Sequence, residues 1–250
     1  MQGCKRVALV VLMAGCGNGD GGALDGGAAG DPLECFETRE GIAVIEGEQL
    51  PFVDEWRVGR DADASGGAYL EWSADSHNND TSFGRFELTL RLANAGTYVL
   101  DIHTRIGRGD NPTEHNDLWM QIADAGAFYG RRDRDGAESR VLPRPLCMDD
   151  DALAAQEAEE GVGEVRCPEG SSRDGYFKVY SSGARDWRWS ARTSDNDAHT
   201  LVVRVDAPGD VTLQLAARAD FMQVDRLVFY EEGVDRDLAR DLTRASTPCR

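Results

Sequence analysis

Apolar and polar residues alternate with a period of two over much of the chain. The clearest examples are residues 86–92, 98–103, 118–122, 201–205 and 211–215. A β-strand points successive side chains to opposite faces, so each segment is predicted to be a strand with one buried face. Segments 86–92 and 98–103 flank the Ala95–Gly96 turn and are expected to form an antiparallel pair. Short strands without a useful amphipathic helix between them predict an all-β sandwich or jelly roll.

Residues 131–173 interrupt this alternation, because they are charged and contain few apolar positions. They are predicted to be one long insertion, in which residues 152–160 (ALAAQEAEE) favour two helical turns. A second short helix is expected near residues 234–243. Long insertions are either functional lids or tolerated decoration, and a cysteine at each end of the acidic part favours decoration.

Three large aromatic residues lie close together in residues 175–191, GYFKVYSSGARDWRWSA. The pattern predicts a hairpin whose first strand ends at Tyr180, followed by a turn at residues 181–183. The second strand would carry Trp187 and Trp189 on one face. Such flat rings with a polar edge suit a sugar ring as well as a protein core.

The first 16 residues have a basic start, a short apolar run and then Ala14, Gly15 and Cys16. The run is too short to cross a membrane, and the segment resembles a bacterial lipoprotein signal with its lipobox. Met13 stands where leucine is usual. The resemblance implies export and a lipid anchor on Cys16 in a bacterial membrane, facing the periplasm or the cell surface. Ordinary signal-peptidase cleavage nearby is the alternative.

Residues 17–34 are rich in glycine and are predicted to be a flexible tether, so that the folded domain would span residues 35–250. Four cysteines remain after Cys4 and Cys16, and an even number in an exported chain favours two disulfides. Three pairings are open. The favoured one joins Cys147 to Cys167 and Cys35 to Cys249. A CxxC pattern is absent, so zinc is not expected.

The formal charge of -18 argues against nucleic acid as a partner, because phosphate contacts need a basic surface. The four histidines show no HExxH spacing, and the chain has no GxSxG, P-loop or dinucleotide-binding motif. A protein that is not an enzyme is therefore favoured.

Several segments together resemble one family group in the same order along the chain. They are IEGE at 45–48, AGTYVLDIHTR at 95–105, HNDLWMQI at 115–122, HTLVVRVDAPGDVTLQLAARA at 199–219 and VDRLVFY at 224–230. This pattern is similar to the galactose-binding-like β-sandwich of bacterial carbohydrate-binding modules, families 6 and 35, and of malectin-like domains. The resemblance covers residues 41–230 apart from the insertion. It implies a jelly-roll sandwich, although fold alone does not fix a ligand.

The resemblance also implies a structural calcium ion between the first and last strands, held by Glu46, Glu48 and Asp225. Calcium prefers several oxygen ligands, which carboxylates and backbone carbonyls supply. The alternative is that Glu46 and Glu48 face solvent while Asp225 pairs with an arginine.

In that family the sugar site lies in loops at one end of the sandwich, where aromatic rings stack on the sugar and amides or carboxylates bind its hydroxyls. By this resemblance Trp187 is the platform, Tyr180 and Trp72 are further walls, and the polar partners are Asn116, Asp117 and His115. The asparagine expected near the last strand is absent, and Gln223 or Asp220 stands there. The polar face carrying Asp101, His103 and Arg105 is either a second binding surface or a cross-strand charge network.

Together these features predict a lipid-anchored, exported sandwich that binds carbohydrate without turning it over. A structural or adhesion subunit that contacts protein in an envelope assembly is the alternative. A glycoside hydrolase or lyase would need two carboxylates at a defined separation in a cleft, which a lone sandwich seldom offers.

Overall fold

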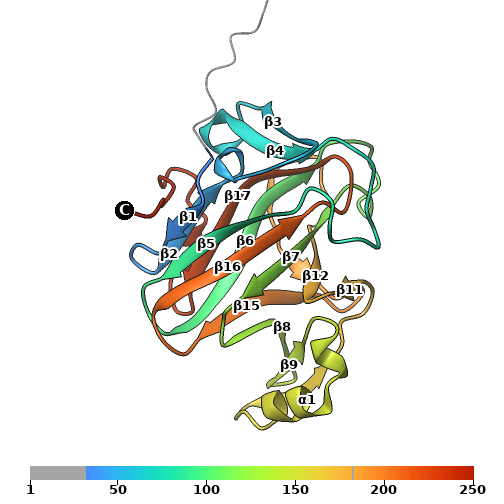
Figure 1. Cartoon of the computed structure of the whole chain (residues 1–250), viewed down its shortest axis with the longest axis vertical. Coiled ribbons are helices and arrows are strands. Elements are labelled where there is room, and N and C mark those ends of the chain that lie inside the picture. The colour runs from blue at the N-terminus through green and yellow to red at the C-terminus, as the bar shows by residue number, and fades with distance from the viewer. Residues whose placement is uncertain (1–31, 182) are drawn as a thin grey trace, which may run out of the picture.

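The computed structural model describes residues 32–181 and 183–250, which form two β-sheets packed face to face (Figure 1). The all-β sandwich predicted from the alternation is confirmed. The expected lipobox with Cys16, and the expected tether up to residue 31, lie outside the described residues. Within the described ranges, neither helix is long and apolar enough to cross a membrane.

Sheet one has five main strands. Its order is β1 (Cys35–Glu37), β5 (Phe86–Leu92), β16 (Gly209–Ala216), β7 (Asp117–Ala123) and β12 (Tyr176–Tyr180). All neighbours are antiparallel except β1 and β5, which are parallel. Two short strands also pair with β12, namely β11 (Ser172–Arg173) and β14 (Arg192–Thr193).

Sheet two lies against it. Its order is β2 (Ile42–Glu46), β17 (Met222–Glu231), β6 (Gly96–Ile106), β15 (His199–Val205), β8 (Ala127–Arg134), β9 (Ala137–Val141) and β10 (Val162–Arg166). The β13 strand (Arg188–Trp189) pairs with β6. A hairpin of β3 (Trp56–Arg60) and β4 (Ala68–Trp72) pairs with the start of β17. Figure 1 shows this hairpin at the end of the molecule opposite the insertion.

Many consecutive strands lie in different sheets, apart from hairpins such as β3–β4 and β8–β9. β5 pairs with β16 of sheet one whereas β6 pairs with β17 of sheet two, so the antiparallel pair expected for residues 86–92 and 98–103 is wrong. The hairpin expected over residues 175–191 is also wrong, because β12 pairs with β7 and β13 with β6. Each connecting turn arches over the core instead. This crossing is typical of a jelly roll.

The core lies between the inner faces of the two sheets. Leu88 and Leu90 of β5 face Leu100 and Ile102 of β6 across it, and all four are at most 3% exposed. Each buried aliphatic side chain of this kind contributes about 1.5–3 kcal/mol. The alternate positions of the same strands point away from the core, so the outer faces of both sheets are left for polar side chains.

The insertion is partly built into sheet two, because β9 and β10 extend that sheet beyond β8. Its helix α1 (Asp150–Glu157) begins after Asp149, whose carboxylate accepts from two backbone N–H groups of the first turn. The helix is the one expected near residues 152–160, shifted by two residues. A short α2 (Arg236–Ala239) falls inside the second helix expected. Three 3-10 turns complete the elements, at Gly47–Gln49, Ser65–Gly67 and Leu146–Met148.

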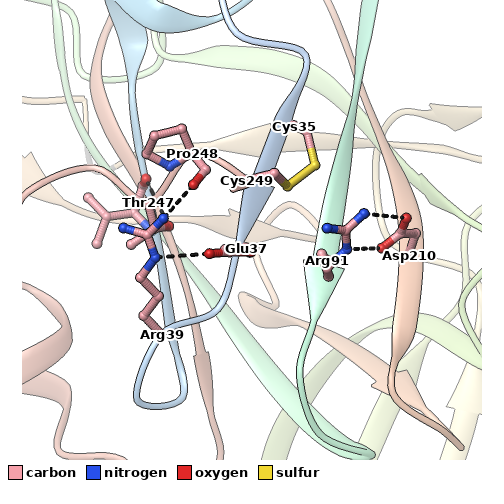
Figure 2. The surroundings of a disulfide bond; sticks show 9 residues. Cys35, Glu37, Arg39, Arg91, Asp210, Thr247, Pro248 and Cys249 are labelled. Atoms are coloured by element: carbon pink, nitrogen blue, oxygen red, sulfur yellow. Dashed lines mark hydrogen bonds and ion pairs between the residues drawn. A yellow bond between two sulfur atoms is a disulfide. The ribbon is translucent and has the colours of Figure 1, made fainter.

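Both expected disulfides are confirmed. Cys35–Cys249 joins β1 to the last residues of the chain, and Cys147–Cys167 closes the acidic part of the insertion. Figure 2 shows that Arg39 reinforces the first one by bonding Glu37 at 3.0 Å and the carbonyl of Pro248 at 2.5 Å. The two ends of the domain are therefore held together covalently and by hydrogen bonds.

Removing each disulfide should destabilise the domain by different amounts. The Cys35–Cys249 link spans 214 residues and the Cys147–Cys167 link spans 20. Because a cross-link restricts the unfolded chain more when its loop is longer, Cys35→Ser/Cys249→Ser should cost about 5 kcal/mol and Cys147→Ser/Cys167→Ser about 3 kcal/mol. Urea unfolding of both variants measures this. A larger loss of unfolding free energy on removal of Cys147–Cys167 than on removal of Cys35–Cys249 would contradict this expectation.

Candidate functional site

A polar furrow crosses the outer face of sheet one where β7 and β12 lie side by side. It consists of three adjoining hollows of about 570, 260 and 320 Å³, here named the first, second and third hollow. The first two share Thr113 and Asp117, and the second and third share Asn78. The shared lining residues make the three hollows neighbours on the surface.

Each hollow is lined mainly by polar side chains. The first is lined by Pro112, Thr113, Asn116, Asp117, Lys178, Tyr180, Ser181, Asp195 and Asn196. The second is lined by Ser76, Asn78, Thr113, Glu114, His115, Asp117, Arg218, Ala219 and Asp220. The third is lined by Asn78, Asn79, Trp119, Arg144, Gly170, Ser171, Ser172 and Arg173.

Strand alternation explains why the lining residues of β7 and β12 face outward. Leu118 and Val179 point into the core, so their neighbours Asp117 and Tyr180 point to the other side of the sheet. Asp117 and Tyr180 are also direct partners across the two strands. The antiparallel register therefore places a carboxylate beside an aromatic ring at the first hollow.

A buried ion pair between Asp117 and Arg218 forms the floor of the furrow. Their side chains are 8% and 10% exposed, and one guanidinium nitrogen of Arg218 donates to Asp117 Oδ2. Burial raises the pKa of Asp117, and the nearby charge of Arg218 opposes this rise. The ion pair keeps a charged acceptor in a place that water reaches poorly.

Two atoms of this ion pair have no partner among the described residues. They are Asp117 Oδ1 and Arg218 Nε, and both are buried. Buried polar atoms in folded proteins are almost always hydrogen-bonded to protein, water or ligand. A hydroxyl group both donates and accepts hydrogen bonds, so it suits either of these atoms.

The rim of the first hollow is held in place by hydrogen bonds. Tyr180 donates its hydroxyl to the carbonyl of Ser194 at 3.0 Å, which fixes the ring while leaving it half-buried. Lys178 forms an ion pair with Asp195 and lies 5.4 Å from the centre of the Tyr180 ring. The amide nitrogen of Asn116 donates to the carbonyls of Pro112 and Ser181, both at 3.2 Å.

The structure brings four of the six expected sugar-binding residues to this furrow. Tyr180, Asn116 and Asp117 line the first hollow, and His115 lines the second. The Nδ1 atom of His115 lies 2.8 Å from the carbonyl oxygen and 3.0 Å from the carboxylate of Asp220. The expected cluster therefore exists, but without its two tryptophans.

Trp72 does not line the furrow, so the expectation that it forms a wall of the sugar site is wrong. Its side chain is 2% exposed, and its ring packs edge-on against Trp56 with centroids 5.4 Å apart. Its indole N–H donates to the carbonyl of Asp75 at 2.8 Å. Trp72 therefore belongs to the core and does not form a wall for a ligand.

Trp187 lies on the outer face of sheet two, away from the residues that line the furrow. Its ring centroid is 5.5 Å from those of Tyr69 and His103, and the guanidinium of Arg105 lies 4.3 Å from it. The half-buried ring is therefore partly covered by the protein itself. The cause is that β12, which ends at Tyr180, belongs to sheet one, whereas β13, which follows Trp187, belongs to sheet two.

The polar face with Asp101, His103 and Arg105 is a network of internal contacts. Arg240 of the chain end pairs with Asp101, Asp225 pairs with His103, and Asp61 pairs with Arg105 at 2.5 Å. Every one of these three polar groups thus has a charged partner. The interpretation as a charge network agrees with these contacts.

The sequence analysis does not predict three parts of the furrow, namely Arg218, Lys178 and the insertion. The alternation of β12 places Lys178 on the same face as Tyr180, and that signal was available. Arg218 and residues 170–173 reach the furrow only through the pairing of β16 and β12 with their neighbours. Their adjacency is a property of the fold.

The three residues expected to bind calcium differ in how far their carboxylates are already paired with other side chains. Arg226 forms a two-pronged ion pair with Glu46 and thereby supplies a positive charge there. Asp225 is fully buried and bonded to His103 through Oδ2. Burial raises the pKa of Glu48 to about 7, and the charges of Glu46 and Asp225 add to the rise.

These surroundings fit a cation at Glu48 and Asp225 better than at Glu46. Glu48 Oε2 and Asp225 Oδ1 are buried without a hydrogen-bond partner among the described residues. Within those residues, no three histidine, cysteine or carboxylate side chains are arranged as a ready set of metal ligands. Backbone carbonyls would have to complete the coordination, as they commonly do for calcium.

Comparison with known proteins gives neither a family nor a named relative for this chain, because no family model and no curated protein sequence matches it. Among solved structures, a family 35 carbohydrate binding module from Clostridium thermocellum is 10% identical with a TM-score of 0.39, covering 76% of this chain and 98% of that one.

A second similar structure is the GH26-CBM35 β-(1,4)-mannanase of Podospora anserina, which is 11% identical with a TM-score of 0.42. The match covers 78% of this chain but only 28% of the mannanase chain. At these levels of similarity neither neighbour assigns a ligand or an activity to this chain. The fold and the site by themselves define a disulfide-linked β-sandwich with a polar furrow on one sheet.

Proposed function

We propose that this protein binds carbohydrate in the furrow of sheet one without turning it over. The observation that carries the proposal is the pair of buried, unpartnered atoms Asp117 Oδ1 and Arg218 Nε, in an ion pair whose Asp117 lines the first hollow together with the half-buried ring of Tyr180. Sugar hydroxyls would supply partners for these atoms. The apolar face of the sugar ring would lie against Tyr180.

The lining of the furrow suits a hydroxyl-rich ligand rather than an apolar one. Amides, hydroxyls and charged groups dominate the three hollows, and the aromatic rings that line them are those of Tyr180, Trp119 and His115. Polar groups that lose water on binding must find partners in the ligand, which makes them selective for hydroxyl patterns. A polysaccharide chain would offer such groups along the length of the furrow.

The pairing of the first hollow's carboxylates with cations supports binding without catalysis. The two carboxylates that line the first hollow are Asp117 and Asp195, and each is paired with a cation, Arg218 and Lys178 respectively. Glycoside hydrolysis needs one carboxylic acid that delivers a proton and a second carboxylate that acts as base or nucleophile. Carboxylates held by cations are better suited to accept hydrogen bonds from a sugar.

Export and lipid anchoring through Cys16 remain part of the proposal. The two disulfides support an oxidising compartment outside the cytoplasm, where such bonds persist. Labelled palmitate should be incorporated into the protein in bacterial cells and should not be incorporated into a Cys16→Ser variant. Equal labelling of both would remove the lipid anchor from the proposal.

Loss of the Tyr180 ring should weaken carbohydrate binding. Tyr180→Ala should reduce retardation in affinity gel electrophoresis about tenfold or more, because a stacked ring at a binding centre is commonly worth 1–2 kcal/mol or more. Tyr180→Phe should stay close to the parent, since the hydroxyl bonds the protein. Asp117→Asn should also weaken binding, with melting temperature recorded to exclude unfolding.

Trp187→Ala is the matched control, because its ring lies on the other sheet. If no polysaccharide is retarded, the proposed function fails. If Trp187→Ala weakens binding more than Tyr180→Ala, the ligand binds on sheet two instead of the furrow. Release of reducing ends from any retarded polysaccharide would show turnover and contradict the non-catalytic part of the proposal.

We also propose a structural calcium ion at Glu48 and Asp225, supported by their unpartnered oxygens. Calcium at a hundredfold excess over its dissociation constant should stabilise the domain by about 2.7 kcal/mol. For a domain of this size the melting temperature should rise by about 5–10 °C. Chelator should reverse the rise, and Glu48→Gln should abolish it while the exposed Glu55→Gln should not. If the melting temperature changes with neither calcium nor chelator, the proposed calcium ion is ruled out.

A further inference from the structure

The third hollow of the furrow differs in charge from the rest of the molecule. The chain has 45 acidic and 27 basic residues, and yet this hollow is lined by two arginines and by no aspartate or glutamate. Its remaining lining consists of two asparagines, two serines, one glycine and the ring of Trp119. All the polar side chains in it can donate hydrogen bonds.

Arg144 carries the main unbalanced charge at this hollow. Its guanidinium donates to the carbonyl oxygens of Gly170 at 3.1 Å and of Pro168 at 3.3 Å. These neutral acceptors hold the guanidinium in place without neutralising it. Among the described residues Arg144 makes no ion pair.

Arg173 lies on the same hollow and is only weakly neutralised. It donates to the carbonyl of Asn79 and lies 3.4 Å from the carboxylate of Asp174. The side chains of Arg173 and Asp174 are 44% and 68% exposed, and such solvent-exposed pairs contribute little. Its charge therefore remains available to a ligand.

Two carboxylates near this hollow are paired with other cations. The carboxylate of Asp195 lies against Gly170, where Lys178 neutralises it. Asp117 is paired with Arg218, whose other terminal nitrogen lies 3.5 Å from the hydroxyl of Ser171. The local balance around the hollow thus favours an anion, in contrast to the overall charge of -18.

The insertion holds this arrangement in place before any ligand binds. Arg144 stands three residues before Cys147, and Gly170 stands three residues after Cys167 of the same disulfide. The hydroxyl of Ser172 accepts from the backbone N–H of Arg144 and donates to the carbonyl of Tyr176, both at 2.8 Å. Donors fixed in this way lose little freedom on binding.

We propose that the third hollow binds an anionic oxygen substituent, a sulfate ester or a carboxylate, of the glycan held in the furrow. Arginine matches such oxyanions with paired N–H donors, and the side chains of Ser171, Asn78 and Asn79 serve the remaining oxygens. Asn78 joins this hollow to the second one, so one chain reaches both. The inference rests on the proposed function and assigns the insertion a role in selecting charged glycans.

The first test uses inorganic sulfate and therefore does not need a glycan. Sodium sulfate, compared with sodium chloride at equal ionic strength, should shift the NMR signal of the Trp119 indole N–H in a saturable manner. Arg144→Gln/Arg173→Gln should weaken the apparent affinity at least tenfold. The control Arg57→Gln/Arg188→Gln removes the same charge from exposed arginines elsewhere and should leave the titration unchanged. An absent shift, or equal effects of both double variants, would overturn the proposal.

The second test compares dextran, dextran sulfate and carboxymethyl dextran of matched length by affinity electrophoresis. A charged form should be retarded at least tenfold more strongly than dextran, and Arg144→Gln/Arg173→Gln should remove that preference. The two charged forms distinguish sulfate from carboxylate. If Tyr180→Ala weakens binding while the arginine variant keeps the preference, the proposed function stands and this inference fails. If sulfate binds but no polysaccharide is retarded, the third hollow binds an anion and the proposed carbohydrate function fails.

Discussion

The period-two alternation of apolar side chains is the constraint on which the rest of this structure depends. Each main strand must present its apolar face to the opposite sheet, and the core forms only when the two inner faces meet. Leu118 and Val179 satisfy this demand, and in doing so they force Asp117, Lys178 and Tyr180 to the outer face. The polar furrow is thus a direct consequence of how the core is packed.

Electrostatic pairing is the second organising feature of this acidic chain. Several carboxylates that the fold buries have an arginine partner, as in Asp117 with Arg218, Glu46 with Arg226 and Asp101 with Arg240. Burying a charge without such a partner would cost several kcal/mol. Arg144 differs from these arginines, because its guanidinium is held by carbonyl oxygens rather than by a carboxylate.

One disulfide constrains the whole domain and the other constrains a local loop. Cys35–Cys249 closes the domain by joining its first strand to its last residues, while Cys147–Cys167 fixes a local loop. The second link holds the two chain segments that carry Arg144 and Gly170, and these segments form a wall of the furrow. The insertion therefore forms part of the furrow wall, whereas the sequence pattern favours decoration.

The sequence by itself determined the all-β class, the positions of the main strands and the number of disulfides, because alternation and cysteine number are local or countable properties; it favoured the observed pairing among three. It also singled out Tyr180, Asn116 and Asp117, which lie on strands or turns whose faces follow from the pattern. Only the tertiary structure decided which strands pair, and with that the separation of Trp187 from Tyr180 and the burial of Trp72. Strand pairing depends on contacts between distant segments, and a turn that arches between sheets has the same local sequence signals as one that closes a hairpin.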